Sequence, residues 1–317
     1  MCAVFDSNFH SSSNYKQLLS YTANTLSMIN TDVFSAVKTA TVAIGLANRD
    51  TGDILSSFGT GFFIGGEYIV SSAHVFSQGI KYNNYYKEKE GIESVYSAFN
   101  ITSRGEQLQS NTYNIESAIR LPSLTEAAGF TGSLDLDLGI GKLDHSSDNF
   151  LHIRQPSRLK LYKEIAMCGY PSGRISLILY KNNHEDPIGI RLSPVIQLGR
   201  IAGLFPTDDN PKPWGIQTDI IAMGGSSGSP IVDPNSGEVL GMAQDVIATM
   251  TTIDKYGMPP SLYDLSKGPL YGIAPIGLAY GVSNQILSLL PNVAKNYFEK
   301  NLPPDFLFQN TGVLKLF

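Results

Sequence analysis

After its first 37 residues, the sequence consists of short apolar runs separated by glycine-rich or polar turns. Residues 41–46 form one such run, residues 48–53 carry turn signals, and residues 54–58 form a return run. This order is the pattern of a β-hairpin. Two more short runs follow at residues 61–66 and 68–71. Many short strands at this spacing are typical of β-barrels or β-sandwiches, so we predict an all-β protein.

The rest of the chain continues this pattern between two less regular ends. Further strands are predicted over residues 134–143, 159–168, 176–180 and 195–204, whereas residues 81–115 are polar and are interpreted as an elaborated loop or hairpin. Ser283 is a capping residue in front of a helically spaced apolar run, which predicts a helix over about residues 283–299. The polar N-terminal residues are expected to include a weakly amphipathic helix over residues 15–29.

Composition and charge narrow the class of protein. Of the 317 residues, 42% are hydrophobic and 16% are charged, which is a globular rather than a disordered composition. The net charge is −5 and the basic residues form no run, so nucleic acid is not an expected partner. The apolar runs are too short to span a bilayer, so no membrane span is expected.

The N-terminal residues and the cysteines bear on the expected location. The start of the chain lacks the basic segment and apolar run of a secretory signal. Cys2 and Cys168 are interpreted as free thiols, which fit a reducing compartment. We therefore expect a cytoplasmic protein, with signal-independent secretion as the alternative.

Three short segments carry the residue types used in nucleophilic catalysis. His74 lies at the end of an apolar strand, a carboxylate opens the strand over residues 135–143, and a Gly/Ser-rich turn occupies residues 223–230. A serine hydroxyl needs an adjacent base to become a nucleophile. A histidine suits that role, and a buried carboxylate fixes its tautomer. These segments indicate a Ser–His–Asp arrangement.

The glycines of the turn have a predicted role of their own. Gly225 allows the backbone to turn so that the N–H groups of Gly225 and Ser227 face one point, as in an oxyanion hole. Gly228 and Ser229 are small, which lets a substrate carbonyl approach.

The choice of carboxylate and serine is open at this point. Asp135 and Asp137 lie on the same face of a strand, so alternation does not choose between them. Ser226, Ser227 and Ser229 share one turn.

The three segments resemble the motifs of chymotrypsin-clan (trypsin-like) serine peptidases. Ser-Ser-Ala-His-Val at residues 71–75 resembles the T-A-A-H-C/V box, and the segment that begins at Asp137 resembles D-L-A-L-L-K-L. Gly-Ser-Ser-Gly-Ser-Pro at residues 225–230 resembles G-[ND]-S-G-G-P. The resemblance favours Asp137 and Ser227, and it implies Ser227 as nucleophile, His74 as general base and Asp137 as the residue that orients the histidine.

The resemblance is closest to the protease domain of HtrA-type enzymes. Residues 217–229 align without a gap with their Q-T-D-A-A-I-N-x-G-N-S-G-G, and residues 237–242 resemble G-E-V-I-G-I. No room is seen after residue 290 for a PDZ domain. Ser226 replaces the acid or amide before the nucleophile, so activation by N-terminal trimming is not expected. Gly139 and Gly141 also depart from the motif and weaken the strand after Asp137.

The resemblance implies a chymotrypsin-like fold of two antiparallel six-stranded β-barrels. The first barrel would span residues 38–155 and carry His74 and Asp137, and the second would span residues 156–282 and carry Ser227. Residues 1–37 would form an N-terminal extension, and residues 283–317 a C-terminal helix and tail. The expected activity is that of a serine endopeptidase acting on proteins or peptides through an acyl-enzyme. No cofactor or metal is expected, and oligomerisation is not indicated.

The substrate pocket follows by position in the family. Its base lies six residues before the nucleophile, at Ile221, with Ala222 next, and the wall strand would supply Gln244 and Val246. None of these is acidic, and the strand lacks the histidine of the glutamyl endopeptidases. A small or medium apolar residue before the scissile bond is therefore expected, unless Asp245 or Asp264 reaches the pocket.

Rival interpretations remain for the protein as a whole. The runner-up is a catalytically silent binding or scaffolding protein with a protease fold. An esterase with an α/β-hydrolase fold is disfavoured, because its serine precedes the acid and the histidine within G-x-S-x-G. The remaining histidines are interpreted as surface residues: His10, His145, His152 and His184.

Overall fold

The structure is a computed structural model. It describes residues 31–104, 107–121, 124–125, 133–134, 136–171, 177–180, 187–191, 194–248 and 277–300. The predicted helix over residues 15–29, Cys2, Asp135 and Asp264 lie outside the described residues.

The first half of the chain closes into a six-stranded antiparallel barrel with the strand order β1-β2-β3-β8-β5-β4. Its strands are β1 (Thr41–Asn48), β2 (Ile54–Gly65), β3 (Tyr68–Ser72), β4 (Ser94–Arg104), β5 (Gln107–Arg120) and β8 (Leu138–Leu143). Strand β2 is continuous where two strands were predicted. The pairing of β1 with β2 skips Phe58, so the apparent break is a β-bulge inside one strand.

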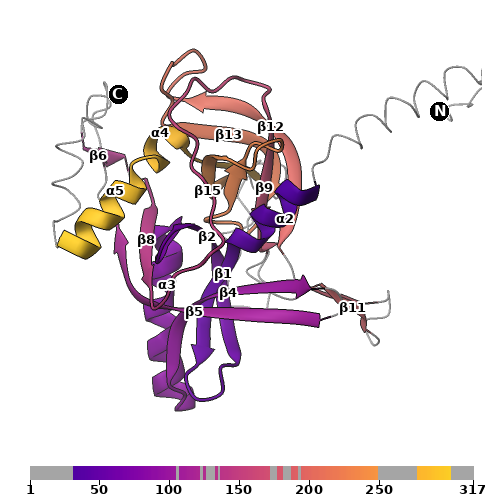
Figure 1. The fold of residues 1–317 in the computed structure, drawn as a ribbon, viewed down its shortest axis with the longest axis vertical. Helices are drawn as coiled ribbons and strands as arrows, with labels where there is room; N and C mark the ends of the chain where they lie inside the picture. The colour runs from indigo at the N-terminus through magenta and orange to yellow at the C-terminus, as the bar shows by residue number, and fades with distance from the viewer. Residues whose placement is uncertain are drawn as a thin grey trace, which may run out of the picture.

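The second half closes into another six-stranded antiparallel barrel, in the order β12-β13-β16-β15-β14-β9. Its strands are β9 (Glu164–Gly169), β12 (Val195–Phe205), β13 (Gly215–Ala222), β14 (Pro230–Val232), β15 (Val239–Ala248) and β16 (Gly277–Ser283). Figure 1 shows the two barrels stacked one on the other, the first in indigo to magenta and the second mainly in orange. The predicted all-β fold with two six-stranded barrels is confirmed.

Smaller elements surround the barrels. Two short hairpins are formed by β6 (Leu124–Thr125) with β7 (Ser133–Leu134) and by β10 (Leu177–Tyr180) with β11 (Pro187–Arg191). The described helical elements are α2 (Thr31–Ala40), α3 (Ala73–Tyr85), the π-helical turn η1 (Tyr86–Glu90), α4 (Asn284–Leu287), α5 (Leu290–Ala294) and the π-helical turn η4 (Lys295–Glu299). The last three make up the C-terminal helical segment that the sequence predicted.

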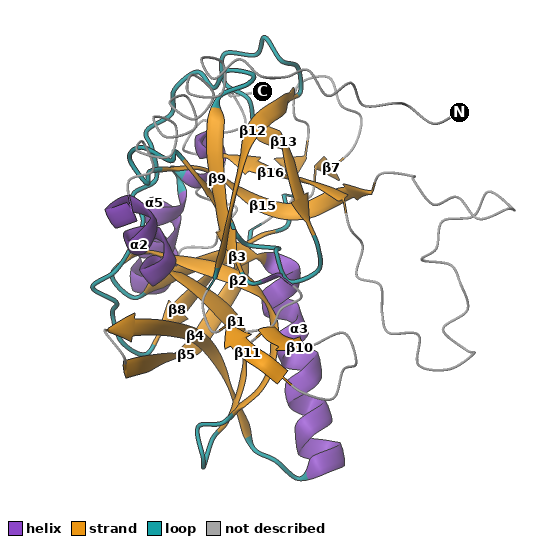
Figure 2. Cartoon of the chain, turned by 90° about the vertical axis from the view of Figure 1, so that its right-hand side faces the viewer, coloured by secondary structure: helices purple, strands orange, loops and turns teal. Residues whose placement is uncertain are grey.

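Helices α2 and α5 close the seam between the barrels. Val37 of α2 and Leu290 and Val293 of α5 belong to one buried apolar cluster, which also takes in residues of both barrels, such as Leu138 and Val232. Figure 2 shows α2 and α5 together on one flank of the two barrels. Burial of this shared cluster fixes how the barrels sit against each other, and the functional residues depend on that placement.

Helix α3 is the main departure from the predicted structure. The sequence placed His74 at the end of a strand, but β3 ends at Ser72, α3 begins at once and the helical residues continue to Glu90. Residues 81–115 were predicted to form a loop or hairpin, and from β4 onward they do belong to the β4–β5 hairpin. The helix can pack flat on β8 because Cβ atoms at Gly139 and Gly141 would lie 2.6 and 3.1 Å from the Phe76 ring. The glycines that weaken this strand thus make room for α3.

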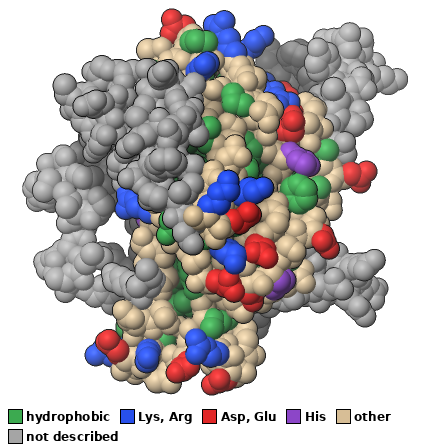
Figure 3. All heavy atoms as spheres, turned by 60° about the vertical axis from the view of Figure 1, so that its left-hand side comes forward, with side chains coloured by type: hydrophobic (Ala, Val, Ile, Leu, Met, Phe, Trp, Pro, Cys, Tyr) green, Lys and Arg blue, Asp and Glu red, His purple; other side chains and the backbone are tan. Residues whose placement is uncertain are grey.

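The outer surface carries charges of both signs. On the face drawn in Figure 3, the described Lys and Arg side chains lie interspersed with Asp and Glu rather than gathered by sign. None of the described helices has both the length and the apolar character needed to cross a membrane.

Candidate active site

Asp137 binds the first turn of α3, which carries His74. The backbone carbonyl of Asp137 accepts the N–H of Ala73 at 2.9 Å. Its carboxylate oxygen Oδ1 accepts the N–H of His74, also at 2.9 Å. These are two of the N-terminal helix donors that have no partner within the helix. A negative charge at this end of a helix is also favourable.

The same carboxylate orients the imidazole ring. Asp137 Oδ2 lies 2.5 Å from His74 Nδ1, and the two side chains are 25% and 42% exposed. With Nδ1 held by the carboxylate, Nε2 is the ring nitrogen left for proton transfer. Both predicted residues are therefore brought together, and in the geometry that a general base requires.

Ser227 lies in a tightly hydrogen-bonded turn of the second barrel. The N–H groups of Ser226 and Ser229 bind the carbonyls of Met223 and Ser226, each at 3.0 Å, and Gly228 N–H binds the carbonyl of Ala243 at 2.7 Å. In contrast, the N–H groups of Gly225 and Ser227 donate to no acceptor among the described residues. Two unused donors therefore flank Ser226 in this turn.

The conformation of Gly225 defines the type of turn. Ser226 N–H binds Met223 C=O, so residues 223–226 form a β-turn with Gly225 in its third position. Gly225 has φ +87°. This value corresponds to a type II turn, because a type I turn has a negative φ at this position. The peptide between Gly224 and Gly225 is therefore in the type II orientation, about half a rotation from that of type I.

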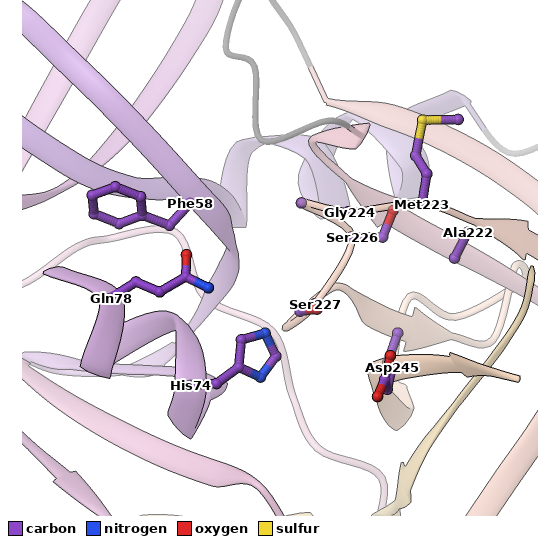
Figure 4. A pocket seen from close by; sticks show the side chains of 11 residues that line it. Phe58, His74, Gln78, Ala222, Met223, Gly224, Ser226, Ser227 and Asp245 are labelled. Carbon is purple, nitrogen blue, oxygen red and sulfur yellow. The ribbon is translucent and has the colours of Figure 1, made fainter. Parts of the chain in front are cut away.

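A cavity of about 460 Å³ joins these residues at the boundary of the two barrels. His74, Gln78 and Phe58 line it from the first barrel, and residues 222–227 with Ala243 and Asp245 line it from the second. Figure 4 shows Ser227 between His74 and Asp245. No hydrogen bond joins Ser227 to His74, both of which are described; catalytic hydrogen bonds are often long before substrate binds.

Two of the predicted pocket residues, Ile221 and Gln244, do not line the cavity. Ile221 is 56% exposed and does not line the cavity. Strand alternation explains this, because Ile220 and Ala222 are buried on the inner face of β13 while Ile221 lies on the outer face. Of the four predicted pocket residues, Ala222 lines the cavity.

The two remaining pocket residues lie on β15. Gln244 is 6% exposed and points away from the cavity lining, which Ala243 and Asp245 supply on either side of it. The side chain of Val246 is outside the description. Asp245, one of the two acids that could make the pocket acidic, therefore lines the cavity.

Tyr280 lies beside Asp245 in the pairing of β15 with β16. Partial burial, followed by the charges of Asp245 and Asp137, raises the pKa of Tyr280. The two carboxylates therefore act on the same phenol. Sequence reasoning gave no sign of this neighbour, because the contact depends on strand pairing.

Other reactive groups are not part of this site. Cys168 is a buried free thiol, and burial raises its pKa to about 12. Across the described residues, no group of three or more His, Cys, Asp or Glu side chains converges as a metal site would require.

The two barrels, with a histidine–carboxylate pair on one and a serine turn on the other, define a peptidase of the two-barrel class. The family model of the trypsin-like peptidase domain matches residues 59–242. The chain therefore belongs to the trypsin-like peptidase family, as the motif resemblance predicted.

Solved structures were also compared with the fold. Deg5 is 17% identical over 68% of this chain and 84% of its own, with a TM-score of 0.41. The HtrA-type protease AlgW with a tripeptide is 14% identical over 85% of this chain, with a TM-score of 0.44, and this chain spans 64% of that one. Rv3671c protease from M. tuberculosis, in an inactive form, is 17% identical over 84% of this chain and 94% of its own, with a TM-score of 0.41. No curated protein matches the sequence.

Proposed function

We propose that this protein is a serine endopeptidase that works through Ser227, His74 and Asp137. The observation that carries the proposal is the His74–Asp137 pair, with Nδ1 and Oδ2 at 2.5 Å, in which His74 lines the same cavity as Ser227. A surface histidine would not need a carboxylate that binds both its ring and its backbone N–H.

The proposed reaction is acyl transfer to Ser227. The Ser227 hydroxyl attacks the carbonyl carbon of a peptide bond while His74 Nε2 takes the hydroxyl proton. His74 then gives that proton to the leaving amine as the C–N bond breaks, which leaves an acyl-enzyme. Water, deprotonated by His74, hydrolyses the ester and restores the serine. Asp137 stabilises the imidazolium in both halves of the reaction.

The developing oxyanion would be bound by the N–H groups of Gly225 and Ser227. The proposal is supported by the type II turn at Gly225 and by the absence of any acceptor for these two N–H groups in the part of the chain that the structure describes. Donors already in place need no reorganisation during the reaction, and one such donor is typically worth about 10²–10³-fold in kcat.

Substrate preference follows from the cavity wall. Ala222, Met223 and Ala243 present short or apolar side chains, which supports the proposed preference for small or medium apolar residues before the scissile bond. Asp245 favours a second candidate for the substrate residue before the scissile bond, a lysine or arginine. Its aliphatic stem would lie on that wall, and its charge would pair with the carboxylate. A peptide series that differs only in this side chain, from norleucine to lysine, separates the two.

The triad is tested with a fluorophosphonate probe and a peptide library on the full chain. The wild type is expected to be labelled on Ser227 and to cleave peptides, whereas Ser227→Ala does neither. Ser226→Ala is the control and should still be labelled. His74→Ala and Asp137→Asn should each lower kcat by several orders of magnitude, about 10⁴-fold for Asp137→Asn, whose amide holds the His74 ring in the wrong tautomer. These losses should not add, because the residues act as a unit.

A silent protease-fold scaffold is the alternative function. A folded wild type that is neither labelled nor active on any library peptide would support the scaffold and refute the peptidase.

A further inference from the structure

Thr60 is a buried polar residue of the first barrel that contacts the serine turn of the second barrel. It lies on β2 of the first barrel, between Gly59 and Gly61, and is completely buried. A buried hydroxyl is costly unless it is hydrogen-bonded. Each of the polar groups of Thr60 has such a partner, and two of these partners belong to the serine turn of the second barrel.

The backbone and the hydroxyl of Thr60 hold the two residues that carry the unused donors. Thr60 N–H binds the carbonyl of Ser227 at 2.9 Å. Thr60 Oγ1 donates to the carbonyl of Gly225 at 2.8 Å. The same Oγ1 accepts the N–H of Tyr170 at 2.9 Å, so the hydroxyl hydrogen is directed at Gly225. The Thr60 carbonyl in turn accepts the hydroxyl of Ser71 at 2.6 Å.

These bonds determine where the turn directs its donors. Because the carbonyls of Gly225 and Ser227 point at β2, the peptide planes that follow each residue are fixed. The N–H groups of Gly225 and Ser227 belong to the preceding peptides, and they have no acceptor among the described residues, in the stretch of the turn that lines the cavity. The bonds to Thr60 therefore act on these two donors through the backbone of Gly225 and Ser227, whose C-terminal peptides they hold against β2.

The turn packs against Thr60 as closely as the backbone permits. A Cβ on Gly228 would lie 1.9 Å from the Thr60 carbonyl oxygen, and a Cβ on Gly59 would lie 3.1 Å from the Ser227 carbonyl oxygen. No side chain or water fits between the two segments, so a change at Thr60 passes directly to the turn.

We propose that Thr60 is a positioning residue that sets the geometry of the oxyanion hole across the boundary of the two barrels. The inference rests on the proposed function. The Thr60 hydroxyl holds the Gly225 peptide from the opposite barrel, and the donors keep their place only while that bond is made. Thr60 touches neither substrate nor reacting atoms and acts through Gly225 and Ser227.

The test compares variants that differ only in the hydroxyl. Thr60→Val has nearly the same shape and keeps the backbone bond to Ser227, but it loses the hydroxyl bonds to Gly225 and Tyr170. Thr60→Ser keeps the hydroxyl and loses the methyl group. Thr218→Val is the matched control, because Thr218 is also completely buried, its hydroxyl donates to Ala279 at 2.9 Å, and it lies on β13 outside the cavity lining.

All variants are assayed as full chains, with active sites counted by fluorophosphonate. Thr60→Val is expected to lower kcat by about 10–100-fold with KM within about threefold, since a misplacement of about 1 Å can cost 10²-fold. Its affinity for a peptide aldehyde, which forms a tetrahedral adduct, should fall in parallel, whereas that for the product peptide should not. Thr60→Ser should restore kcat to within a few-fold. Thr218→Val should lower Tm and leave kcat unchanged.

Two outcomes would overturn the proposal. The first is a Thr60→Val enzyme that unfolds at lower temperature but retains the wild-type kcat per titrated site. The second is an equal loss of affinity for the aldehyde and the product peptide. Should Thr60→Val not fold, Thr60→Cys keeps a weaker donor and is expected to show an intermediate kcat; a wild-type value there would also refute the role. An unlabelled, inactive wild type would instead refute the proposed function itself.

Discussion

Replacing Gly228 with alanine is expected to destabilise the fold for two separate reasons, backbone strain and a steric clash. Gly228 has φ +88°, a left-handed conformation that costs other residues about 1–2 kcal/mol. The new Cβ would also lie 1.9 Å from the Thr60 carbonyl oxygen and 2.4 Å from Ser71 Oγ. Because the first of these atoms is backbone, the turn itself has to move, and overpacking of this kind costs about 1–3 kcal/mol. Gly228→Ala is therefore expected to lower the free energy of unfolding by about 2–5 kcal/mol.

Gly52→Ala is the control that isolates the backbone cost. Gly52 has φ +75°, and a Cβ there would have no heavy atom within 4 Å. At about 2 °C per kcal/mol, thermal unfolding should give a Tm loss of about 2–4 °C for Gly52→Ala and about 4–10 °C for Gly228→Ala. Labelling of the nucleophile by fluorophosphonate should slow only in Gly228→Ala, because only that change displaces the serine turn. Equal Tm losses in the two variants would refute the close approach of the turn to β2.

Two further substitutions test the charges. In Asp245→Asn, kcat/KM for norleucine peptides should stay within a few-fold of the wild-type value. If the wild type prefers lysine, the lysine-to-norleucine ratio of kcat/KM should fall about tenfold or more. An unchanged ratio would exclude Asp245 from substrate recognition. Asp233 is buried and binds Lys163 at 2.8 Å and Arg154 at 3.1 Å. Burial opposes ionisation and by itself would raise the pKa of Asp233. The hydrogen bonds that its carboxylate accepts from Lys163 and the Asn235 N–H outweigh burial, together with the charges of Lys163 and Arg154, and the pKa falls below its ordinary 3.8. A lowered folded-state pKa stabilises the protein above about pH 4, and this stabilisation is lost as the pH falls further. Asp233→Asn should thus destabilise at pH 7 and progressively less below pH 4 in denaturant titrations; equal losses at both would contradict the ion pairs.

The sequence predicted most of the strands, because strand and turn signals are local, and it pointed to His74 and Ser227, which the structure places on one cavity. Short apolar runs between turns define most strands of the barrels. His74 and Ser227 lie in short motifs whose neighbouring residues identify them without any contact distant in sequence. Helix α3 could not be predicted in this way. Its sequence, Ala-His-Val-Phe-Ser-Gln-Gly-Ile, has no clear helical signal, and the helix is stabilised by Phe76 packing over Gly139 and Gly141, more than 60 residues later in the chain.

Ile221 was placed in the pocket by its position in the chain, but it lies on the exposed face of β13. Counting six residues back from Ser227 gives a position along the chain but not the direction of its side chain. The alternation in β13 contained that information, since Thr218, Ile220 and Ala222 share the buried face. Thr60 and Tyr280 were missed for a different reason, because their contacts join segments that are distant in sequence.

The backbone at Asp137 gives this residue a structural role beside the orienting role proposed for its carboxylate. Asp137 has φ +41°, a region that residues other than glycine rarely enter and that costs about 1–3 kcal/mol. The two hydrogen bonds that it accepts from Ala73 and His74 N–H offset this cost and define the start of α3. Aspartate and asparagine tolerate this conformation better than other residues. Asp137→Asn keeps the backbone conformation and the helix cap, but its amide N–H₂ faces His74 Nδ1 in place of a carboxylate oxygen, so the ring loses both the charge and its acceptor and is held in the wrong tautomer. Asp137→Ala loses the cap as well, so the asparagine variant separates the effect on the ring from the effect on the start of α3.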